Sequence, residues 1–286
     1  MRIAPTPSGF LHEGNALAFL ITAQLAKQNH ARLRLRIDDL DAERERPAYV
    51  DDIFASLRWL GIVWTDGPRD RHDHERNWSQ QHRITRYMDH LELLKEQGDL
   101  YACRCSRSTF QEHQLKGSRR CDCRARNLAF GSPDVVWRLH LPQDALVRME
   151  QVFGEAIMLT PADLITDPVL RQRATEEGPG RPAYQIASLA DDVDHGTTII
   201  VRGNDLLPST ACQLYMADRL GLGSFKHVRF LHHPLITDPQ GHKLSKSESA
   251  LALKAMRGIE GAADGLHLRA NTILGELAKA ATQDHH

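Results

Sequence analysis

Two short segments combine residue types that could hold a nucleotide. Residues 11–15 read Leu-His-Glu-Gly-Asn, and residues 243–247 read Lys-Leu-Ser-Lys-Ser. Glycine lets the backbone approach a phosphate closely, and a helix that begins there offers free N–H groups and a positive dipole end. Two lysines with serines between them could clamp a transferring phosphoryl group. Each segment alone is weak evidence, because a histidine before a glycine is usually structural and a Lys-Ser-Lys segment is usually a solvated loop.

Four of the five cysteines lie in two pairs, Cys103 with Cys105 and Cys121 with Cys123. Four thiolates suit a tetrahedral zinc ion, and without a secretory signal such pairs favour metal ligation over disulfides. The C-x-C spacing is less common than C-x-x-C, so four free cysteines or a structural disulfide in an oxidising host remain alternatives. A zinc ion with four thiolate ligands has no open position, so we expect a structural role.

A basic stretch lies beside the second cysteine pair: Lys116, Arg119, Arg120, Arg124 and Arg126. The whole chain has 36 basic and 37 acidic residues and a formal net charge of -1, so any RNA-binding surface must be local. Charge alone favours a solvated loop over an RNA contact.

The elements around these segments indicate an α/β protein. Residues 2–6 could form a strand, a helical pattern follows Gly14, and residues 33–37 alternate as Leu-Arg-Leu-Arg-Ile. This strand–helix–strand order predicts a βαβ unit and a parallel sheet. Further expected helices cover residues 49–60, 80–97, 209–220 (with a Ser/Thr cap) and 250–281; further expected strands cover 135–141, 146–152, 197–201 and 228–231.

We expect four parts in the chain. Residues 1–98 form the first half of a nucleotide-binding domain, residues 99–180 an insert with the cysteines, residues 181–247 the second half, and residues 248–286 a helical tail. The length of 286 residues and the apolar fraction of 41% fit an ordinary globular protein. No apolar run reaches the roughly 18 residues of a membrane span, and no signal pattern opens the chain. We therefore expect a cytoplasmic protein without membrane segments.

The two nucleotide segments, in this order, resemble the HIGH and KMSKS motifs of class I aminoacyl-tRNA synthetases. Asn15 stands where the first motif has its second histidine, and Leu244 replaces the methionine of the second. Five more stretches, in the family's order, resemble the glutamyl branch: residues 2–9, 36–41, 57–62 with 66–68, 182–187 with 191–192, and 201–206. The resemblance extends from Arg2 to about Ser247.

This resemblance implies a Rossmann-type parallel sheet split by a zinc-containing α+β insert, and ATP-dependent activation of glutamate with Mg²⁺. It implies catalytic roles for His12, Lys243 and Lys246. It also implies an ATP site made of Pro7, His12, Gly14, Asn15, Asp205, Lys243, Ser245 and Lys246.

The same resemblance implies an amino-acid site of Arg2, Thr6, Asp38, Tyr184, Ser188 and Arg202. Arginine suits a carboxylate and an acid suits the α-amino group, which fits glutamate. Two positions depart from the family pattern: Asp38 stands where bacterial glutamyl enzymes usually have glutamate, and Ser188 replaces an asparagine of some relatives. Glutamate therefore remains favoured but not secured. In related enzymes a C-x-C pair follows a tyrosine, here Tyr101, at the start of the acceptor-stem insert.

The few residues after Ser247 predict that no anticodon-binding domain follows. In this the chain resembles the truncated glutamyl-queuosine tRNA(Asp) synthetases. That resemblance implies a monomer that transfers glutamate from glutamyl-adenylate to queuosine in the tRNA(Asp) anticodon loop. Two alternatives remain: a compact glutamyl-tRNA synthetase-like ligase that charges a tRNA 3′ end or another acceptor, and a non-catalytic zinc-containing RNA-binding paralogue. Retention of His12 with Lys243 and Lys246 argues against the paralogue.

Overall fold

A computed structural model describes residues 1–106, 108–109, 121–176, 178–235 and 250–283. The lysine-serine segment of residues 243–247 lies outside these ranges, as do Lys116, Arg119 and Arg120 of the basic stretch. None of the helices in the described part combines the length and apolar character needed to cross a membrane.

The chain opens with the predicted βαβ unit. Strand β1 (Arg2–Ile3) pairs in parallel with β2 (Arg34–Leu35), and helix α1 (Glu13–Gln28) connects them. The segment of residues 60–70 returns to β2, where Asp66 pairs with Arg34 and Gly67 adopts a φ of 114°. A Cβ at Gly67 would lie 2.1 Å from the carbonyl oxygen of Leu35, so only glycine fits this close approach.

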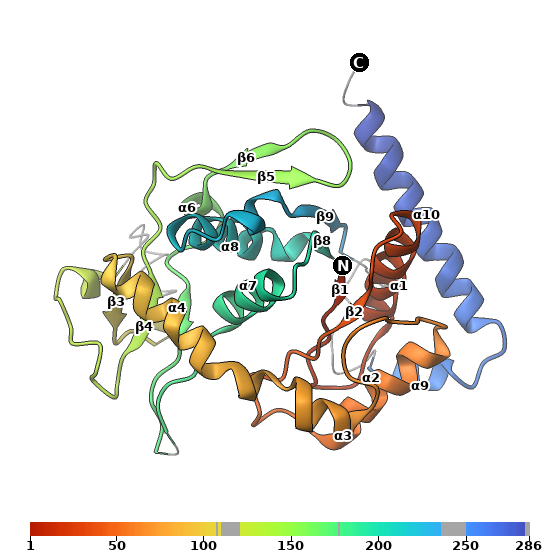
Figure 1. The fold of residues 1–286 in the computed structure, drawn as a ribbon, viewed down its shortest axis with the longest axis horizontal. Helices are drawn as coiled ribbons and strands as arrows, with labels where there is room; N and C mark the ends of the chain where they lie inside the picture. The colour runs from red at the N-terminus through yellow and green to blue at the C-terminus, as the bar shows by residue number, and fades with distance from the viewer. Residues whose placement is uncertain (107, 110–120, 177, 236–249, 284–286) are drawn as a thin grey trace.

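Five helical segments follow β2. They are α2 (Pro47–Trp59), the short α3 (Arg71–Asp73), the π-helical η1 (His74–Trp78), the 3-10 turn η2 (Gln80–Arg83) and α4 (Ile84–Glu96). The predicted helix over residues 80–97 thus begins as a 3-10 turn. Helix α4 connects the region of α3 to the sheet of the insert (Figure 1).

The cysteine-bearing insert is built on an antiparallel sheet of β3 (Leu100–Cys103), β4 (Val136–Leu139) and β7 (Val169–Arg171). The 3-10 turn η3 (Asp122–Arg124) lies beside β3; it contains Cys123, and Cys121 directly precedes it. The short helix α6 (Pro161–Leu164) precedes β7.

A second sheet has the strand order β6-β5-β9-β8. Strand β9 (Arg229–His233) pairs in parallel with both β8 (Ile199–Gly203) and β5 (Val147–Gln151), while β6 (Ile157–Leu159) is antiparallel to β5. The expected insert of residues 99–180 therefore supplies strands to both sheets. In the described part of the chain, β1 and β2 form a hydrogen-bonded pair of their own, so the parallel strands are not one continuous sheet.

Two helices cover the second sheet, α7 (Tyr184–Asp194) and α8 (Leu207–Arg219), with the 3-10 turns η4 (Asn204–Leu206) and η5 (Gly223–His227) at the ends of α8. The expected Ser/Thr cap of α8 is wrong. The helix begins two residues earlier, with Pro208 in its first turn and no side-chain cap at Leu206, so Ser209 lies inside the helix.

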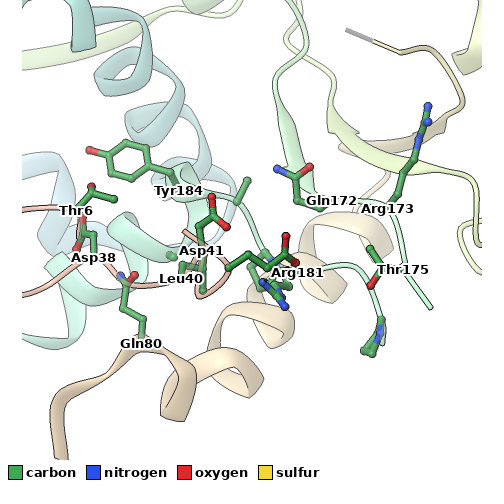
Figure 2. Close-up of a pocket in the computed structure, with 15 residues that line it drawn as sticks. Thr6, Asp38, Leu40, Asp41, Gln80, Gln172, Arg173, Thr175, Arg181 and Tyr184 are labelled. Atoms are coloured by element: carbon green, nitrogen blue, oxygen red, sulfur yellow. Dashed lines mark ion pairs between the residues drawn. The ribbon is translucent and has the colours of Figure 1, made fainter. Parts of the chain in front are cut away.

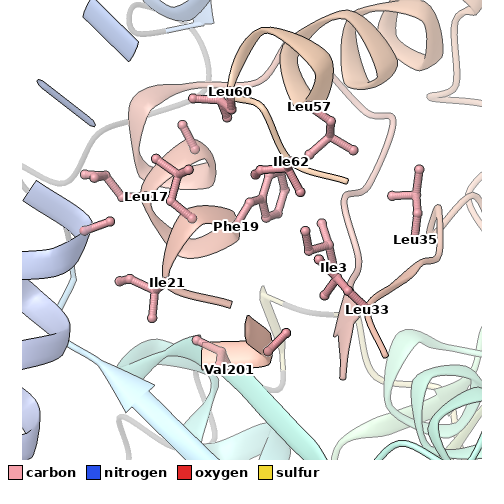
Figure 3. Close-up of a cluster of buried hydrophobic side chains, with 14 of the residues drawn as sticks. Ile3, Leu17, Phe19, Ile21, Leu33, Leu35, Leu57, Leu60, Ile62 and Val201 are labelled. Carbon is pink, nitrogen blue, oxygen red and sulfur yellow. The ribbon is translucent and has the colours of Figure 1, made fainter. Parts of the chain in front are cut away.

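The predicted helical tail is two helices, α9 (Ala250–Met256) and α10 (Ala262–Gln283), and Gly261 at the break has a φ of 74°. Helix α10 lies along α1 at one side of the molecule (Figure 1). Leu266, Ala270 and Leu274 of α10 join an apolar core with residues of β1, α1, α2 and β8. Figure 3 shows this core, in which Ile3 and Val201 belong to the two separate groups of parallel strands. Burial of this apolar surface holds both halves of the domain together.

Candidate nucleotide and amino-acid site

The first nucleotide segment forms the start of α1. His12 is the N-cap, with its Nδ1 accepting a hydrogen bond from the Asn15 N–H at 3.4 Å, and Asn15 Oδ1 accepts from the His12 N–H at 3.1 Å. Because Nδ1 is an acceptor, the neutral tautomer that fits this cap carries its proton on Nε2. The side chain of Asn15, predicted to contact ATP, closes this reciprocal cap.

A cavity of about 660 Å³ lies between the start of α1 and the carboxyl end of β8. The carboxyl ends of parallel strands are where open α/β sheets bind their ligands. Asp205 reaches this cavity past Gly203, where a Cβ would lie only 2.6 Å from Asp205 Oδ1. The cavity brings together seven predicted site residues: Arg2, His12, Gly14, Asn15, Tyr184, Arg202 and Asp205.

A second cavity, of about 560 Å³, is lined by Thr6, Asp38 and Tyr184 (Figure 2). Tyr184 lines both cavities, so the two cavities are neighbours, and five of the six predicted amino-acid residues line one or both of them: Arg2, Thr6, Asp38, Tyr184 and Arg202. Across the second cavity, Arg181 forms an ion pair with Glu43 at 3.4 Å. Pro7 and Ser188 do not line either of these two cavities.

Buried arginines and carboxylates form the floor of this region. Arg2 Nε lies 3.1 Å from Asp192 Oδ1, and Arg36 Nη1 donates to the same oxygen at 3.0 Å. Burial acts to raise the pKa of Asp192, but Arg2, Arg36 and Arg202 outweigh it and lower that pKa to about 2. Asp192 is therefore ionised at neutral pH and holds two arginines in place.

Asp38, expected to meet the α-amino group, is paired with Arg36. Arg36 donates from Nε to Asp38 Oδ1 at 2.5 Å and from Nη2 to Oδ2 at 3.2 Å. Burial raises the pKa of Asp38, and Arg36 opposes that shift. A carboxylate has about four acceptor positions, so Asp38 retains acceptors for a ligand. Ser188 is buried and accepts from Arg36 Nη2 with its Oγ at 3.1 Å, which orients Arg36.

Arg202 is 4% exposed and only partly satisfied. Its Nη1 donates to Thr210 Oγ1 at 3.1 Å and to Gln213 Oε1 at 2.9 Å, and the guanidinium lies 5.7 Å from the centre of the Phe230 ring. Nε and Nη2 have no hydrogen-bond partner within the described ranges. Unpaired buried N–H groups on a cation are costly, and a carboxylate is the partner that suits them.

The sequence analysis missed the residues that position Arg202. Thr210 and Gln213 are three residues apart in α8, so they lie on one face of the helix. Because a helix was expected here, this spacing could have predicted that the two polar side chains share a partner. His232 contacts Thr210 Oγ1 through Nε2 at 2.9 Å. Burial, with Arg202 and His233 nearby, lowers the pKa of His232 to about 4, so this ring is neutral at pH 7.

A second missed set fastens α4 to α7 through buried Asp191. Its carboxylate accepts from Tyr87 Oη at 2.8 Å, Gln80 Nε2 at 2.8 Å and Arg83 Nε at 2.7 Å. These bonds join η2 and α4 to α7, and Gln80 also lines the second cavity.

The four paired cysteines converge as predicted. Cys103 Sγ lies 3.6 Å from Cys121 Sγ, and Cys105 Sγ lies 3.7 Å from Cys123 Sγ, with all four sulfur atoms within 4.8 Å of one another. A tetrahedral zinc ion with Zn–S bonds of about 2.3 Å places its sulfurs roughly 3.8 Å apart. The cluster therefore fits zinc in both its donors and its spacing. All four cysteines are free of disulfides.

The chain matches the family described as tRNA synthetases class I (E and Q), catalytic domain, over residues 1–262. It belongs to this family. The fold is thus the class I synthetase catalytic fold, and the predicted membership is confirmed.

Among its relatives is a glutamyl-Q tRNA(Asp) synthetase of Pseudomonas fluorescens, 38% identical over 96% of this chain and 83% of the relative. Glutamate–tRNA ligase 2 of Gluconobacter oxydans is 34% identical over 99% of this chain but 61% of the relative. A solved glutamate–tRNA synthetase from Elizabethkingia anophelis superimposes with a TM-score of 0.69 at 25% identity, over 86% of this chain and 52% of the other. The chain thus spans little more than half the length of these two ligases.

Proposed function

We propose that the protein activates glutamate with ATP and Mg²⁺ to glutamyl-adenylate and transfers the glutamyl group to tRNA. The observation that carries this proposal is Arg202, a buried cation with two unpaired donor atoms at the edge of a cavity that also contains His12. A carboxylate bound to Arg202 and a phosphate at the start of α1 would meet in one cavity.

The reaction has two steps. A glutamate carboxylate oxygen attacks the α-phosphorus of ATP, an acyl–phosphate bond forms, and pyrophosphate leaves. His12 Nε2–H and the N–H groups at the start of α1 donate to the phosphate oxygens, and Lys243 and Lys246 stabilise the developing charge. A hydroxyl of the tRNA then attacks the acyl carbon, and AMP leaves with the electron pair. No protein nucleophile is needed.

We assign Arg202 and Arg2 to the carboxylates of glutamate and Asp38 to its α-amino group. Arg36 neutralises part of the charge of Asp38, so the amino group is bound by the pair rather than by an isolated buried carboxylate. Tyr184 lines both cavities and Thr6 lines the second, so both would contact the bound amino acid. In this assignment Asp205 contacts ATP from the side of β8, and Pro7 and Gly14 shape the loop that approaches it.

We propose that the acceptor is queuosine of tRNA(Asp). The chain covers 83% of the glutamyl-Q tRNA(Asp) synthetase of Pseudomonas fluorescens but 61% of the Gluconobacter ligase. The names of the ligases support the second candidate, transfer to a tRNA 3′ end.

The acceptor is tested with labelled glutamate and two forms of tRNA(Asp), one with queuosine and one with guanine at the same position. Label on the queuosine form alone supports the first acceptor. Label on both forms would contradict queuosine as the acceptor. If that label is lost when the 3′ terminal diol is oxidised beforehand, the acceptor is the tRNA 3′ end.

We further propose that the cysteine cluster holds a structural zinc ion. Four thiolates leave no open position on the metal, so this ion would fold the insert and take no part in the chemistry. It would order the stretch that carries Arg124 and Arg126 for contact with tRNA phosphates. We propose a cytoplasmic location, where ATP and tRNA are both present.

A further inference from the structure

A second group of potential metal ligands lies behind the amino-acid cavity. Asp39 directly follows Asp38 after β2, Glu45 precedes α2, and His74 begins η1. One side-chain ligand atom from each of the three residues lies within 4.8 Å of the others. Asp39 and His74 are buried and Glu45 is partly buried. The group is separate from the cysteine cluster, which lies on β3 and η3.

His74 is the unusual member of this group. Its side chain is 0% exposed, and neither ring nitrogen has a hydrogen-bond partner in the described part of the chain. Nε2 lies 3.1 Å from Asp39 Oδ2, yet the two atoms are not aligned as a hydrogen bond. The axis of Nε2 therefore points beside the oxygen. When two ligand atoms each bind the same ion at about 2.1 Å, they lie roughly 3 Å apart. Each then points at the ion and not at the other ligand atom.

Hydrogen bonds from two further residues orient the Asp39 carboxylate. Ser79 Oγ donates to Oδ2 at 2.5 Å and the Gln80 N–H donates to Oδ1 at 2.8 Å. Carboxylates that bind metals are usually held by such additional hydrogen bonds. His74 also opens a π-helical turn, His74–Trp78, and such turns occur frequently at functional sites.

We infer that Asp39, Glu45 and His74 bind one divalent ion of the zinc or manganese class. One imidazole with two carboxylates suits these ions, whereas magnesium and calcium prefer oxygen ligands throughout. The two carboxylates would neutralise the charge of the ion in a buried place. Bound there, the ion fastens η1 and the segment 41–46 to the end of β2. Asp41 and Glu43 of that segment line the cavity with Asp38.

The test measures metal content, which does not depend on the amino-acid substrate or on tRNA. Wild type, His74→Gln and Glu45→Gln are each dialysed against Zn²⁺ and then against metal-free buffer, and bound zinc is counted per chain. His82→Gln and Glu43→Gln are matched controls, an exposed histidine and a carboxylate of the same segment. We expect wild type and both controls to hold one more zinc than His74→Gln and Glu45→Gln.

Mn²⁺ distinguishes this site from the cysteine cluster, because thiolates bind that hard ion poorly. Electron paramagnetic resonance of free Mn²⁺ should show one equivalent bound by wild type and the controls and none by the two variants, with circular dichroism confirming that each variant is folded. Equal zinc in all five proteins together with no Mn²⁺ bound by wild type would overturn the inference and leave His74 and Asp39 as an ordinary buried ion pair. If His74→Gln fails to fold, the test uses Glu45→Gln alone, because Glu45 is only partly buried. The zinc and Mn²⁺ that this variant binds are then compared with those of wild type.

Discussion

The cysteine cluster and the candidate amino-acid site are built in opposite ways. All four cysteines come from residues 103–123, in two pairs, and their sulfur atoms already lie at distances that suit one zinc ion. The amino-acid site instead joins residues from distant parts of the chain, such as Arg2 and Asp192. A local cluster can be read from spacing alone, whereas a distributed site depends on the fold that assembles it. The two regions should therefore fail independently.

The largest effect is expected from Arg202→Ala, which removes the proposed carboxylate partner. Truncating one member of a buried charge pair costs about 3 kcal/mol, so kcat/KM for glutamate should fall roughly 100-fold in ATP–pyrophosphate exchange. Zinc content should not change. Arg219→Ala is the matched control, because Arg219 lies on the same helix and pairs with Asp99. A loss of activity shared by the control would contradict the assignment.

Cys103→Ser probes the other region. We expect loss of zinc and local unfolding of β3 and its neighbours, seen as faster hydrogen exchange of their amides, because metal binding and folding of such loops are coupled. Glutamate activation should persist, because the cavity around Arg202 does not include the cluster. Cys212→Ala, at a buried cysteine of α8, should keep its zinc. Zinc retained in Cys103→Ser would count against the four-thiolate site.

The third prediction concerns pH and the carboxylate beneath the site. The folded pKa of Asp192, about 2, is below the unfolded value of about 4, so its ionised form stabilises the fold above about pH 4. That contribution, on the order of 2 kcal/mol, is lost as the pH falls from 4 to 2. The control is Asp89→Asn, at an exposed position of α4. In urea unfolding at pH 7, Asp192→Asn should have a lower free energy of unfolding than the control. On acidification its free energy of unfolding should fall by less than that of the control. Parallel pH profiles for the two variants would refute this role.

The smallest effect is expected from Thr210→Val, which keeps the shape of the side chain and removes one hydrogen bond to Arg202. A loss of about 1 kcal/mol should raise KM for glutamate roughly fivefold with little change in kcat. Ser209→Ala, on the neighbouring position of α8, serves as the control. An unchanged KM would mean that Gln213 alone positions Arg202.

The sequence predicted the elements whose apolar pattern is regular. The opening βαβ unit and the strands near residues 147–151, 199–203 and 229–233 stand where they were expected, because each is a short run of buried alternating or continuous apolar residues. Helix α7 was missed. Its buried face includes Ser188, Asp191 and Asp192, so polar residues that pair with Arg2, Arg36 and Tyr87 interrupt the apolar pattern.

The resemblance supplied the candidate site residues, but it did not supply their geometry. Residue types at Arg2, Asp38 and Arg202 pointed to an amino-acid site, and the fold brings them to one region. The pairing of Asp38 with Arg36 and the support of Arg202 by Thr210 depend on contacts between elements, which spacing along the chain does not encode. The parallel pairing of β5 with β9 also depends on such a contact between distant elements, so it was not predicted from the sequence.

The most direct test of the account is glutamate-dependent ATP–pyrophosphate exchange by the full chain without tRNA, with glutamine and aspartate as controls. The arrangement of Arg202, Asp38 and His12 around two neighbouring cavities predicts exchange with glutamate and little with the other two amino acids. Absence of glutamate-dependent exchange, both without tRNA and after tRNA is added, would contradict the proposed activity.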